Sequence, residues 1–297
     1  MCHTQRARPH PGPRASRGLL MNALLETLLV TLFVVVSCQV VLWLVSLRLR
    51  DASIADPAWG AGFVLVAWGA FLLNDPTATR SLLLAILTTL WGMRLTLYLL
   101  ARNAGHGEDR RYAAMRTRHG PRFARVSFWT VFLLQAVVLW FVSWPIQAAA
   151  ANASRTPLGW IDLTGTLLWL VGFGFEATAD WQLARFKLRP EHAGRVFDGG
   201  LWRYTRHPNY FGDFCVWWGI YLVAAAAGAW WTIASPLLMS YLLLRVSGVA
   251  LLEQTIAERR PDYIRYQQVT STFFPWPPRR GVSRDDADHG RDLPSMH

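Results

Sequence analysis

The chain has 297 residues, of which 53% are hydrophobic and only 16% charged, and it contains 16 tryptophans. Its mean hydropathy is +0.20. A soluble globular domain carries about 25% charged residues, so this composition excludes an ordinary soluble domain and predicts a membrane protein in contact with the lipid bilayer. The net charge is +11, but the basic residues gather in short loops between apolar runs, as the positive-inside rule describes. We therefore expect no nucleic-acid partner.

The three cysteines indicate neither a metal site nor a disulfide framework. Cys2, Cys38 and Cys215 lack the spacing of metal ligands, and the last two lie inside apolar segments. We expect no metal cofactor.

Seven apolar stretches dominate the sequence. A helix that crosses the hydrocarbon core of a bilayer needs about 20 mostly apolar residues. We therefore predict an all-α integral membrane protein with about seven transmembrane helices, forming a single domain over residues 21–278. Residues 158–278 make up the C-terminal half of this domain, and residues 279–297 are expected to form a disordered tail. The stretches are residues 21–47, 57–73, 81–101, 128–150, 158–179, 210–227 and 230–252.

Arginine and lysine collect in two of the connecting segments, within residues 102–125 and 185–206. The positive-inside rule assigns such segments to the cytoplasm. With seven helices, the C-terminus is then cytoplasmic and the N-terminus lies outside.

The first twenty residues conflict with this orientation, because their four arginines resist translocation. They are also rich in proline and glycine and have nothing to pack against. We predict that residues 1–20 are a disordered leader or an over-extended start, and that the working chain begins at Met21.

The stretch RYTRHPNYFGDF, residues 203–214, brings many polar side chains to the start of an apolar segment. Pro208 is tolerated near a helix start, so a helix is expected to begin around Asn209. Helical spacing then puts Asn209, Asp213 and Trp217 on one face. The amide groups of the helix start, with arginines just before them, suit an anion such as phosphate. The candidate cofactor-binding residues of this stretch and helix are Arg203, Arg206, His207, Asn209, Tyr210, Asp213 and Trp217.

Each of these residues also has an ordinary structural explanation. Arginines at a membrane boundary set topology, tyrosine and tryptophan form interfacial belts, and asparagine or aspartate caps a helix. The density of polar groups favours a binding site over this alternative.

A second polar set follows the last apolar stretch. Glu253 stands at the membrane boundary, where an ionisable residue is a functional candidate because its burial is costly unless it is paired. Arg259 and Arg260 are its candidate partners, and a solvated Glu253 is the alternative. Tyr263 and Tyr266 lie three residues apart and could stack on a base or bond a ribose, or belong to an interfacial belt. We include Glu253, Arg260, Tyr263 and Tyr266 among the candidate cofactor-binding residues.

A third polar set lies in FEATADWQLARFK, where Glu176 and Asp180 are four residues apart. This spacing puts both carboxyl groups on one helix face. Glu176 is the deeper of the two in the apolar segment and therefore the more costly to bury.

The motif HPNYFGD, the following Trp217 and the closing FFPWPP together resemble the C-terminal half of the steroid 5-alpha-reductase and sterol double-bond reductase superfamily. With DPAWGAGF, GEDRRY and SGVALLE in addition, residues 21–278 resemble the bacterial family catalogued as domain of unknown function 1295. The resemblance implies a helical membrane bundle that NADPH enters from the cytoplasm and a lipid substrate enters from the bilayer. It also implies a multi-pass protein of the bacterial inner membrane.

By this resemblance, Asn209 and Asp213 match positions that contact NADPH, and Tyr266 matches a tyrosine near the cofactor. The implied reaction is hydride transfer from the nicotinamide to the β carbon of a conjugated carbonyl, in a lipid, steroid-like or isoprenoid substrate. The expected function is therefore an NADPH-dependent reductase of a carbon–carbon double bond.

A proton donor must complete such a reaction, and the donors of the 5-alpha-reductases have no match in this chain. The candidate catalytic residues are Tyr98 and Glu176, and Asp56 and Tyr112 are further possible donors.

Two other functions suit the same motifs. Isoprenylcysteine carboxyl methyltransferases also have an Arg-His-Pro run and a glutamate-rich stretch on a later helix, where they bind S-adenosylmethionine. His207 and Glu253 suit that alternative, whereas LLEQ has one glutamate where those enzymes have two, and NYFGD is the reductase form. The third alternative is a non-catalytic, lipid-binding membrane protein.

Overall fold

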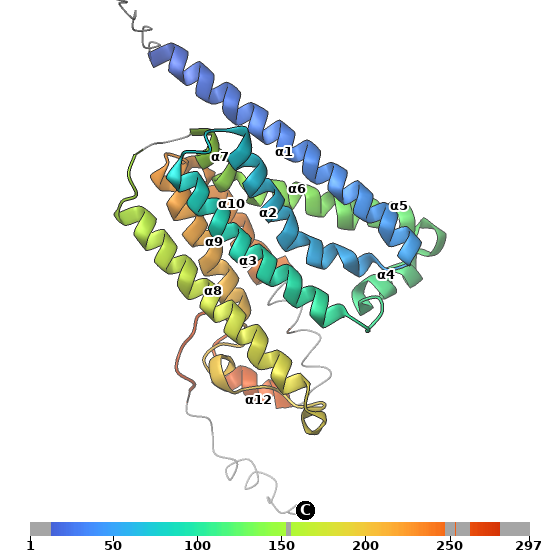
Figure 1. Ribbon diagram of the computed structural model, residues 1–297. Helices are drawn as coiled ribbons and strands as arrows, with labels where there is room; N and C mark the ends of the chain where they lie inside the picture. Colours follow the sequence, from blue (N-terminus) through green and yellow to red (C-terminus); the bar gives the residue numbers. More distant parts are fainter. Residues whose placement is uncertain (1–12, 153–155, 247–252, 254–261, 280–297) are drawn as a thin grey trace, which may run out of the picture. The chain divides into compact units, whose positions relative to one another are not determined.

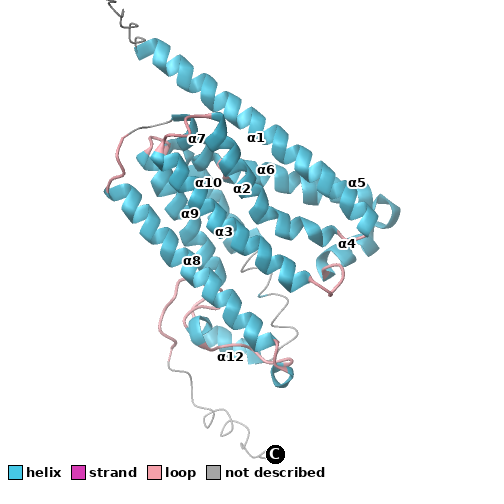
Figure 2. Ribbon diagram, in the orientation of Figure 1, coloured by secondary structure: helices cyan, strands magenta, loops and turns pink. Residues whose placement is uncertain are grey.

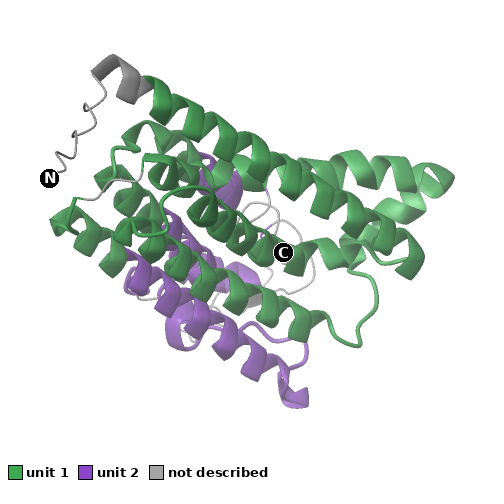
Figure 3. Ribbon diagram, turned by 45° about the horizontal axis from the view of Figure 1, so that its top comes forward, with its two compact units in different colours: residues 1–167, 218–237 green, residues 168–217, 238–297 purple. Residues whose placement is uncertain are grey.

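The structure, a computed structural model, describes residues 13–152, 156–246, 253 and 262–279. Its described part is built of helices joined by turns and loops, with no strand among these residues (Figures 1 and 2). The chain divides into two compact units, of which unit 1 comprises Met1–Leu167 and Trp218–Leu237, and unit 2 comprises Leu168–Trp217 and Leu238–His297 (Figure 3). This confirms the all-helical class expected from the apolar stretches.

Most of the helices belong to unit 1. They are α1 (Pro13–Leu49), α2 (Ala55–Leu73), α3 (Thr79–Asn103), α4 (Arg110–His119), α5 (Phe123–Ser127), α6 (Leu134–Val142) and α7 (Trp144–Asn152), with a π-helix over Phe128–Leu133 between α5 and α6. Three helices contribute residues to both units, namely α8 (Trp160–Lys187), α9 (Pro208–Ala226) and α10 (Ala234–Tyr241). Unit 2 also holds a π-helix over Leu242–Val246 and the short α12 (Asp262–Val269).

Four helical stretches are long and apolar enough to cross a membrane, namely Gly18–Leu49, Ala52–Leu73, Thr79–Asn103 and Arg110–Val142. The outer face of the first carries exposed Leu25, Leu29 and Phe33, as a helix in contact with lipid does. The described structure therefore fits a multi-pass membrane protein. The number of seven spans and their orientation stay predictions.

Several boundaries differ from the sequence-based expectation. α1 begins at Pro13, inside the segment expected to be a disordered leader, since proline is favoured in the first turn of a helix. The stretch 128–150 is interrupted at Ser143, between α6 and α7. The remaining part of the expected leader and the end of the stretch 230–252 lie outside the described residues, as does the expected tail after residue 279.

In unit 1, α2 and α3 approach closely through glycine. A Cβ atom added to Gly60 would lie 2.3 Å from the carbonyl oxygen of Gly92, and one added to Gly92 would lie 2.6 Å from that of Gly60. The Thr96 hydroxyl donates to the Pro57 carbonyl in the same contact, at 2.9 Å. Small residues allow helix backbones to meet in this way in lipid, where packing replaces the hydrophobic driving force.

A buried polar network ties α1 to α6 and α7. The Thr31 hydroxyl donates to Oε1 of Gln147 at 2.5 Å, and Nε2 of Gln147 donates to the Ser143 hydroxyl at 2.7 Å. The Trp140 indole donates to the Leu28 carbonyl at 2.9 Å. Polar groups at membrane depth need internal partners, so these bonds fix how α1 packs against its neighbours.

In unit 2, a glycine pair brings α8 and α9 together. A Cβ atom on Gly172 would lie 2.5 Å from the Gly212 carbonyl oxygen, and one on Gly212 would lie 2.6 Å from the Gly172 carbonyl oxygen and from the Glu176 amide nitrogen. Since neither residue has a side chain, the helices pack backbone to backbone. This contact places the acidic residues of α8 next to the start of α9.

Candidate functional site

The segment just before α9 is bound to the C-terminal segment of unit 2. The backbone N–H of Arg206 donates to the Ser271 carbonyl at 2.8 Å, and the Thr205 hydroxyl donates to the Phe273 carbonyl at 2.8 Å. Pro208 begins α9, as proline is tolerated in the first turn of a helix. The start of α9 is thereby fixed against residues 271–273.

Arg206 is the centre of a buried network. Its Nε donates to Oε1 of Glu253 at 2.7 Å, and its Nη2 donates to Oε2 of Glu253 at 3.1 Å and to the Thr272 hydroxyl at 2.7 Å. Its Nη1 donates to the carbonyls of Gln267 and Thr270, both at 2.8 Å. A guanidinium has five N–H donors, and these five bonds use them all. Arg206 therefore anchors the C-terminal segment in this structure, and its expected role as a phosphate ligand stays a prediction.

Glu253 joins Arg206 to His207. Nε2 of His207 lies 3.1 Å from Oε1 of Glu253, and the His207 ring stacks on Tyr210 with 5.6 Å between ring centroids. Burial raises the pKa of Glu253, but the hydrogen bonds from His207 and Arg206, with their charges, outweigh burial and lower it to about 2. Glu253 is therefore an ionised carboxylate near neutral pH.

Tyr263 and Tyr266 are both buried on α12, with their rings in an edge-to-face contact 5.7 Å between centroids. Burial raises the pKa of Tyr263 to about 12, helped by the charge of Glu253. The Tyr266 hydroxyl donates to the Trp202 carbonyl, which ties α12 to the turn before α9. The structure thus brings both tyrosines to the Arg206 network, and their contact with a cofactor stays a prediction.

Asn209 connects the start of α9 to the acidic face of α8. Its Nδ2 donates to Oδ1 of Asp180 at 3.2 Å, and its Oδ1 accepts the N–H of Tyr210 at 3.0 Å. Asp180 and Glu176 are both buried. An amide and two carboxyl groups with little exposure to water are suited to bind a polar ligand or to transfer a proton.

The other two residues expected on this face of α9 lie further along the helix. Asp213 is half-buried and Trp217 is buried. Among the described residues, no group of three or more His, Cys, Asp or Glu side chains is placed to hold a metal ion.

A groove of about 560 Å³ opens beside Arg206. Phe274 and Trp276 line it and are 59% and 70% exposed. Arg279 lines it as well, together with amide and hydroxyl side chains from residues 267–272. The groove therefore offers aromatic, polar and cationic groups together.

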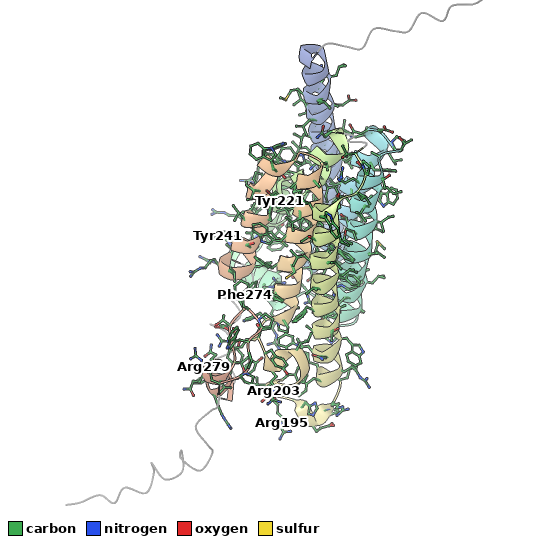
Figure 4. All side chains as sticks on the ribbon, turned by 90° about the vertical axis from the view of Figure 1, so that its left-hand side faces the viewer. Arg195, Arg203, Tyr221, Tyr241, Phe274 and Arg279 are labelled. Atoms are coloured by element: carbon green, nitrogen blue, oxygen red, sulfur yellow. The ribbon has the colours of Figure 1, made fainter. Side chains whose placement is uncertain are left out.

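Exposed arginines lie at the same end of unit 2. Figure 4 places Arg195, Arg203 and Arg279 there, and all three side chains are exposed. In contrast to Arg206, the exposed guanidinium groups of Arg203 and Arg279 are accessible to a phosphate ligand. Arg260, which was expected to bind the cofactor, lies outside the described residues.

The candidate proton donors of the N-terminal half lie in unit 1. The Tyr112 hydroxyl donates to Oδ1 of Asp56 at 2.7 Å, and Nη2 of Arg111 donates to Oδ2 of Asp56 at 2.8 Å. Tyr98 is half-buried on α3. The structure thus brings Asp56 and Tyr112 together, and the catalytic roles of Tyr98 and Glu176 stay predictions.

Sequence reasoning missed a buried ion pair in unit 1. Nε and Nη2 of Arg80 lie 2.7 and 2.9 Å from the two carboxylate oxygens of Asp162, and both side chains are buried. Arg80 directly precedes the apolar stretch 81–101, and Asp162 is the only ionisable residue in the first half of the stretch 158–179. Ionisable residues in membrane segments usually pair with one another. That signal could have identified the pair.

Comparison with known proteins places the chain in a family. A family model described as "Protein of unknown function (DUF1295)" matches residues 42–270. The chain is 27% identical over 269 residues to "Uncharacterized protein C594.04c" of Schizosaccharomyces pombe, and the match covers 79% of this chain and 76% of that protein. No solved structure matches the chain.

Proposed function

The chain belongs to the DUF1295 family, and from this premise we propose that it is a membrane-embedded, NADPH-dependent reductase of a carbon–carbon double bond in a lipid, steroid-like or isoprenoid substrate. One observation carries the proposal. The buried network of Arg206, His207 and Glu253 opens onto a groove that offers aromatic, polar and cationic groups together.

These groups fit the parts of a nucleotide cofactor. A base stacks on exposed aromatic rings such as Phe274 and Trp276. Ribose hydroxyls bond amide, hydroxyl and carboxylate groups, and phosphates bind arginine through charge-assisted hydrogen bonds. Arg203 and Arg279 would hold the phosphates, because Arg206 already has a protein acceptor for each N–H group.

Bound NADPH would supply the hydride, and the chain would supply placement and a proton. Asn209 and Asp213 would hold the cofactor at the start of α9, where Asp180 orients the Asn209 amide. Glu176 is buried beside this helix start, so we propose it as a proton donor, with Tyr98 as the other candidate. A lipophilic substrate would enter from the bilayer.

Ligand-dependent stability tests this proposal. A ligand held at 100 times its dissociation constant stabilises the folded state by about 2.7 kcal/mol. In detergent, NADPH should raise the melting temperature of the purified protein and S-adenosylhomocysteine should not. A shift with S-adenosylhomocysteine alone would contradict the reductase, and a folded protein that responds to neither would favour a non-catalytic, lipid-binding function.

A second candidate function has its own supporting observation. The charge of Arg206 is neutralised by Glu253, and Glu176 and Asp180 add two buried acidic groups near the start of α9. Such an acidic surrounding suits a cofactor with a positive sulfonium group. An S-adenosylmethionine-dependent methyltransferase is therefore the alternative, and the same melting experiment separates it from the reductase.

We also propose a topology for the bilayer. Seven spans with the N-terminus outside would put the segments rich in arginine, and with them the groove, in the cytoplasm. In a bacterium, this membrane would be the inner membrane. Labelling of single cysteines introduced into the loops with a membrane-impermeant reagent tests this: labelling from outside in the segment 185–206 would contradict it.

A further inference from the structure

A second groove, in unit 1, lies far along the chain from the proposed cofactor site. It has a volume of about 560 Å³ and is lined by Trp43, Pro121, Arg122, Ala124, Arg125 and Phe128. These residues come from the end of α1 and from the turn and helix that follow α4, and Figure 1 shows α1 ending beside α4 and α5. The proposed reductase does not use this groove.

Specific contacts build the apolar wall of the groove. The Trp43 indole donates to the Ala124 carbonyl at 3.0 Å, and the Trp43 ring packs edge to face on Phe128 with 5.0 Å between centroids. Behind them lies a core cluster that includes the buried Phe123 and Phe132. The wall is therefore a fixed part of unit 1.

Two arginines supply the charge. Arg122 and Arg125 are three residues apart and both are exposed. Within the described part of the chain, neither side chain makes an ion pair or a hydrogen bond, in contrast to Arg111 and Arg116, which pair with acids nearby. Two guanidinium groups at the rim of one groove are suited to an anion with several oxygen atoms, such as a phosphate.

The position of the groove indicates what the anion is attached to. The first candidate span ends at Leu49, close after Trp43, and the apolar run of the fourth span begins at Phe128 with a π-helix. π-helices occur frequently at functional sites. Trp129, which contacts Phe128 and is 59% exposed, extends the aromatic surface toward the apolar run. The two arginines of the groove therefore lie where the apolar spans end, and its aromatic rings, Trp43 and Phe128, lie on the side of the apolar segments.

A molecule with a phosphate head and an apolar tail matches this arrangement. We propose that the groove binds an anionic phospholipid, whose headgroup phosphate contacts Arg122 and Arg125 and whose acyl chains lie against the aromatic side. Basic pockets at the ends of transmembrane helices bind anionic lipid headgroups by the same chemistry. Val41, Leu44 and Val45 of α1 lie close to Trp43 in the sequence and are exposed and apolar. An acyl chain could therefore pack against them.

Native mass spectrometry of the full-length protein in detergent tests the proposal, with titration of phosphatidylglycerol and of phosphatidylcholine with the same acyl chains. The parent should bind its first phosphatidylglycerol at least about tenfold more tightly than phosphatidylcholine. The double variant Arg122→Gln/Arg125→Gln should lose this preference. Both side chains are exposed, so the variant should keep the parent's melting temperature.

A matched control removes the same charge elsewhere. Arg110 and Arg118 are also exposed and do not line the groove, so Arg110→Gln/Arg118→Gln should keep the preference for phosphatidylglycerol. Equal loss in both double variants would show general charge attraction and overturn the proposal, as would binding in Arg122→Gln/Arg125→Gln that equals the parent's. Displacement of the lipid by millimolar inorganic phosphate would also overturn it, because the site would then take the anion without its tail.

Discussion

The guanidinium of Arg206 and the carboxylate of Glu253 form a two-point ion pair, with 2.7 Å between Nε and Oε1 and 3.1 Å between Nη2 and Oε2. The pair joins the segment before α9 to a residue just beyond the last apolar stretch of the sequence. Because Arg206 also bonds the carbonyls of Gln267 and Thr270, one side chain holds together three parts of unit 2.

Loss of this pair should destabilise the protein. Glu253→Gln leaves the buried Arg206 charge without its counter-ion, so we expect the free energy of unfolding to fall by about 2–3 kcal/mol. Thermal melting in detergent measures the change. Asp109→Asn is the control, because the Arg111 side chain of the Asp109–Arg111 pair is 55% exposed and asparagine can keep the N-cap bond of Asp109 to the backbone of α4. This substitution should cost less than about 1 kcal/mol. Equal effects of the two substitutions would show that the Glu253 pair contributes no more than a surface pair.

The same pair predicts a dependence on pH. The pKa of Glu253 is lowered from 4.5 to about 2 in the folded protein. A carboxyl group of this kind stabilises the folded state fully above its unfolded pKa, and this contribution is lost as the pH falls through the folded pKa. The parent should therefore lose stability between about pH 4.5 and pH 2, over and above any loss in Glu253→Gln. Melting temperatures of the parent and of Glu253→Gln, measured across this pH range, test the prediction. A difference in melting temperature that does not change with pH would contradict it.

The contact of α8 with α9 should not tolerate a side chain at Gly212. A Cβ atom there would lie 2.6 Å from backbone atoms of Gly172 and Glu176, so Gly212→Ala must push the helices apart. We expect a loss of about 1–3 kcal/mol of stability. Gly174→Ala is the control on α8, since nothing lies within 4 Å of its added Cβ, and it should melt at or above the parent's temperature. Similar melting of the two variants would mean that the helices do not meet at Gly212.

Much of the helical structure could be predicted from the sequence. The expected span 57–73 corresponds to α2, Ala55–Leu73, because an unbroken apolar run bounded by polar residues marks both ends of a helix in lipid. The break at Ser143 has a sequence signal that the hydropathy-based spans ignored, because Pro145 lacks the N–H group that would continue α6 and lies in the first turn of α7 instead. The π-helix at Phe128–Leu133 could not be predicted, because hydropathy does not encode the backbone hydrogen-bond register within a helix.

The residues of the site were easier to identify than their partners. The sequence pointed to Glu253 as a residue in need of a counter-ion and suggested neighbours a few positions away, whereas the structure pairs it with Arg206, far earlier in the chain. In the same way, Asn209 and Asp180 came from two separate motifs, and only the glycine contact of α8 with α9 brings them together. Such pairings depend on tertiary structure, which local patterns do not reveal.

Titration of NADPH into purified variants tests the proposed cofactor site most directly. Asn209→Ala and Asp213→Ala should each weaken binding about tenfold or more, because each removes a proposed cofactor contact. Asn209→Ala also takes the amide donor away from the buried Asp180 carboxyl group, at about 1–3 kcal/mol. Cys215→Ala is the control on the same helix. The Cβ atom of Cys215 faces the place that a Cβ atom added to Gly172 would take, 2.8 Å away, and alanine keeps this atom, so NADPH affinity should match the parent's. If Asn209→Ala and Asp213→Ala bind NADPH with the parent's affinity and only have lower melting temperatures, these two residues stabilise the start of α9 and do not form a cofactor site.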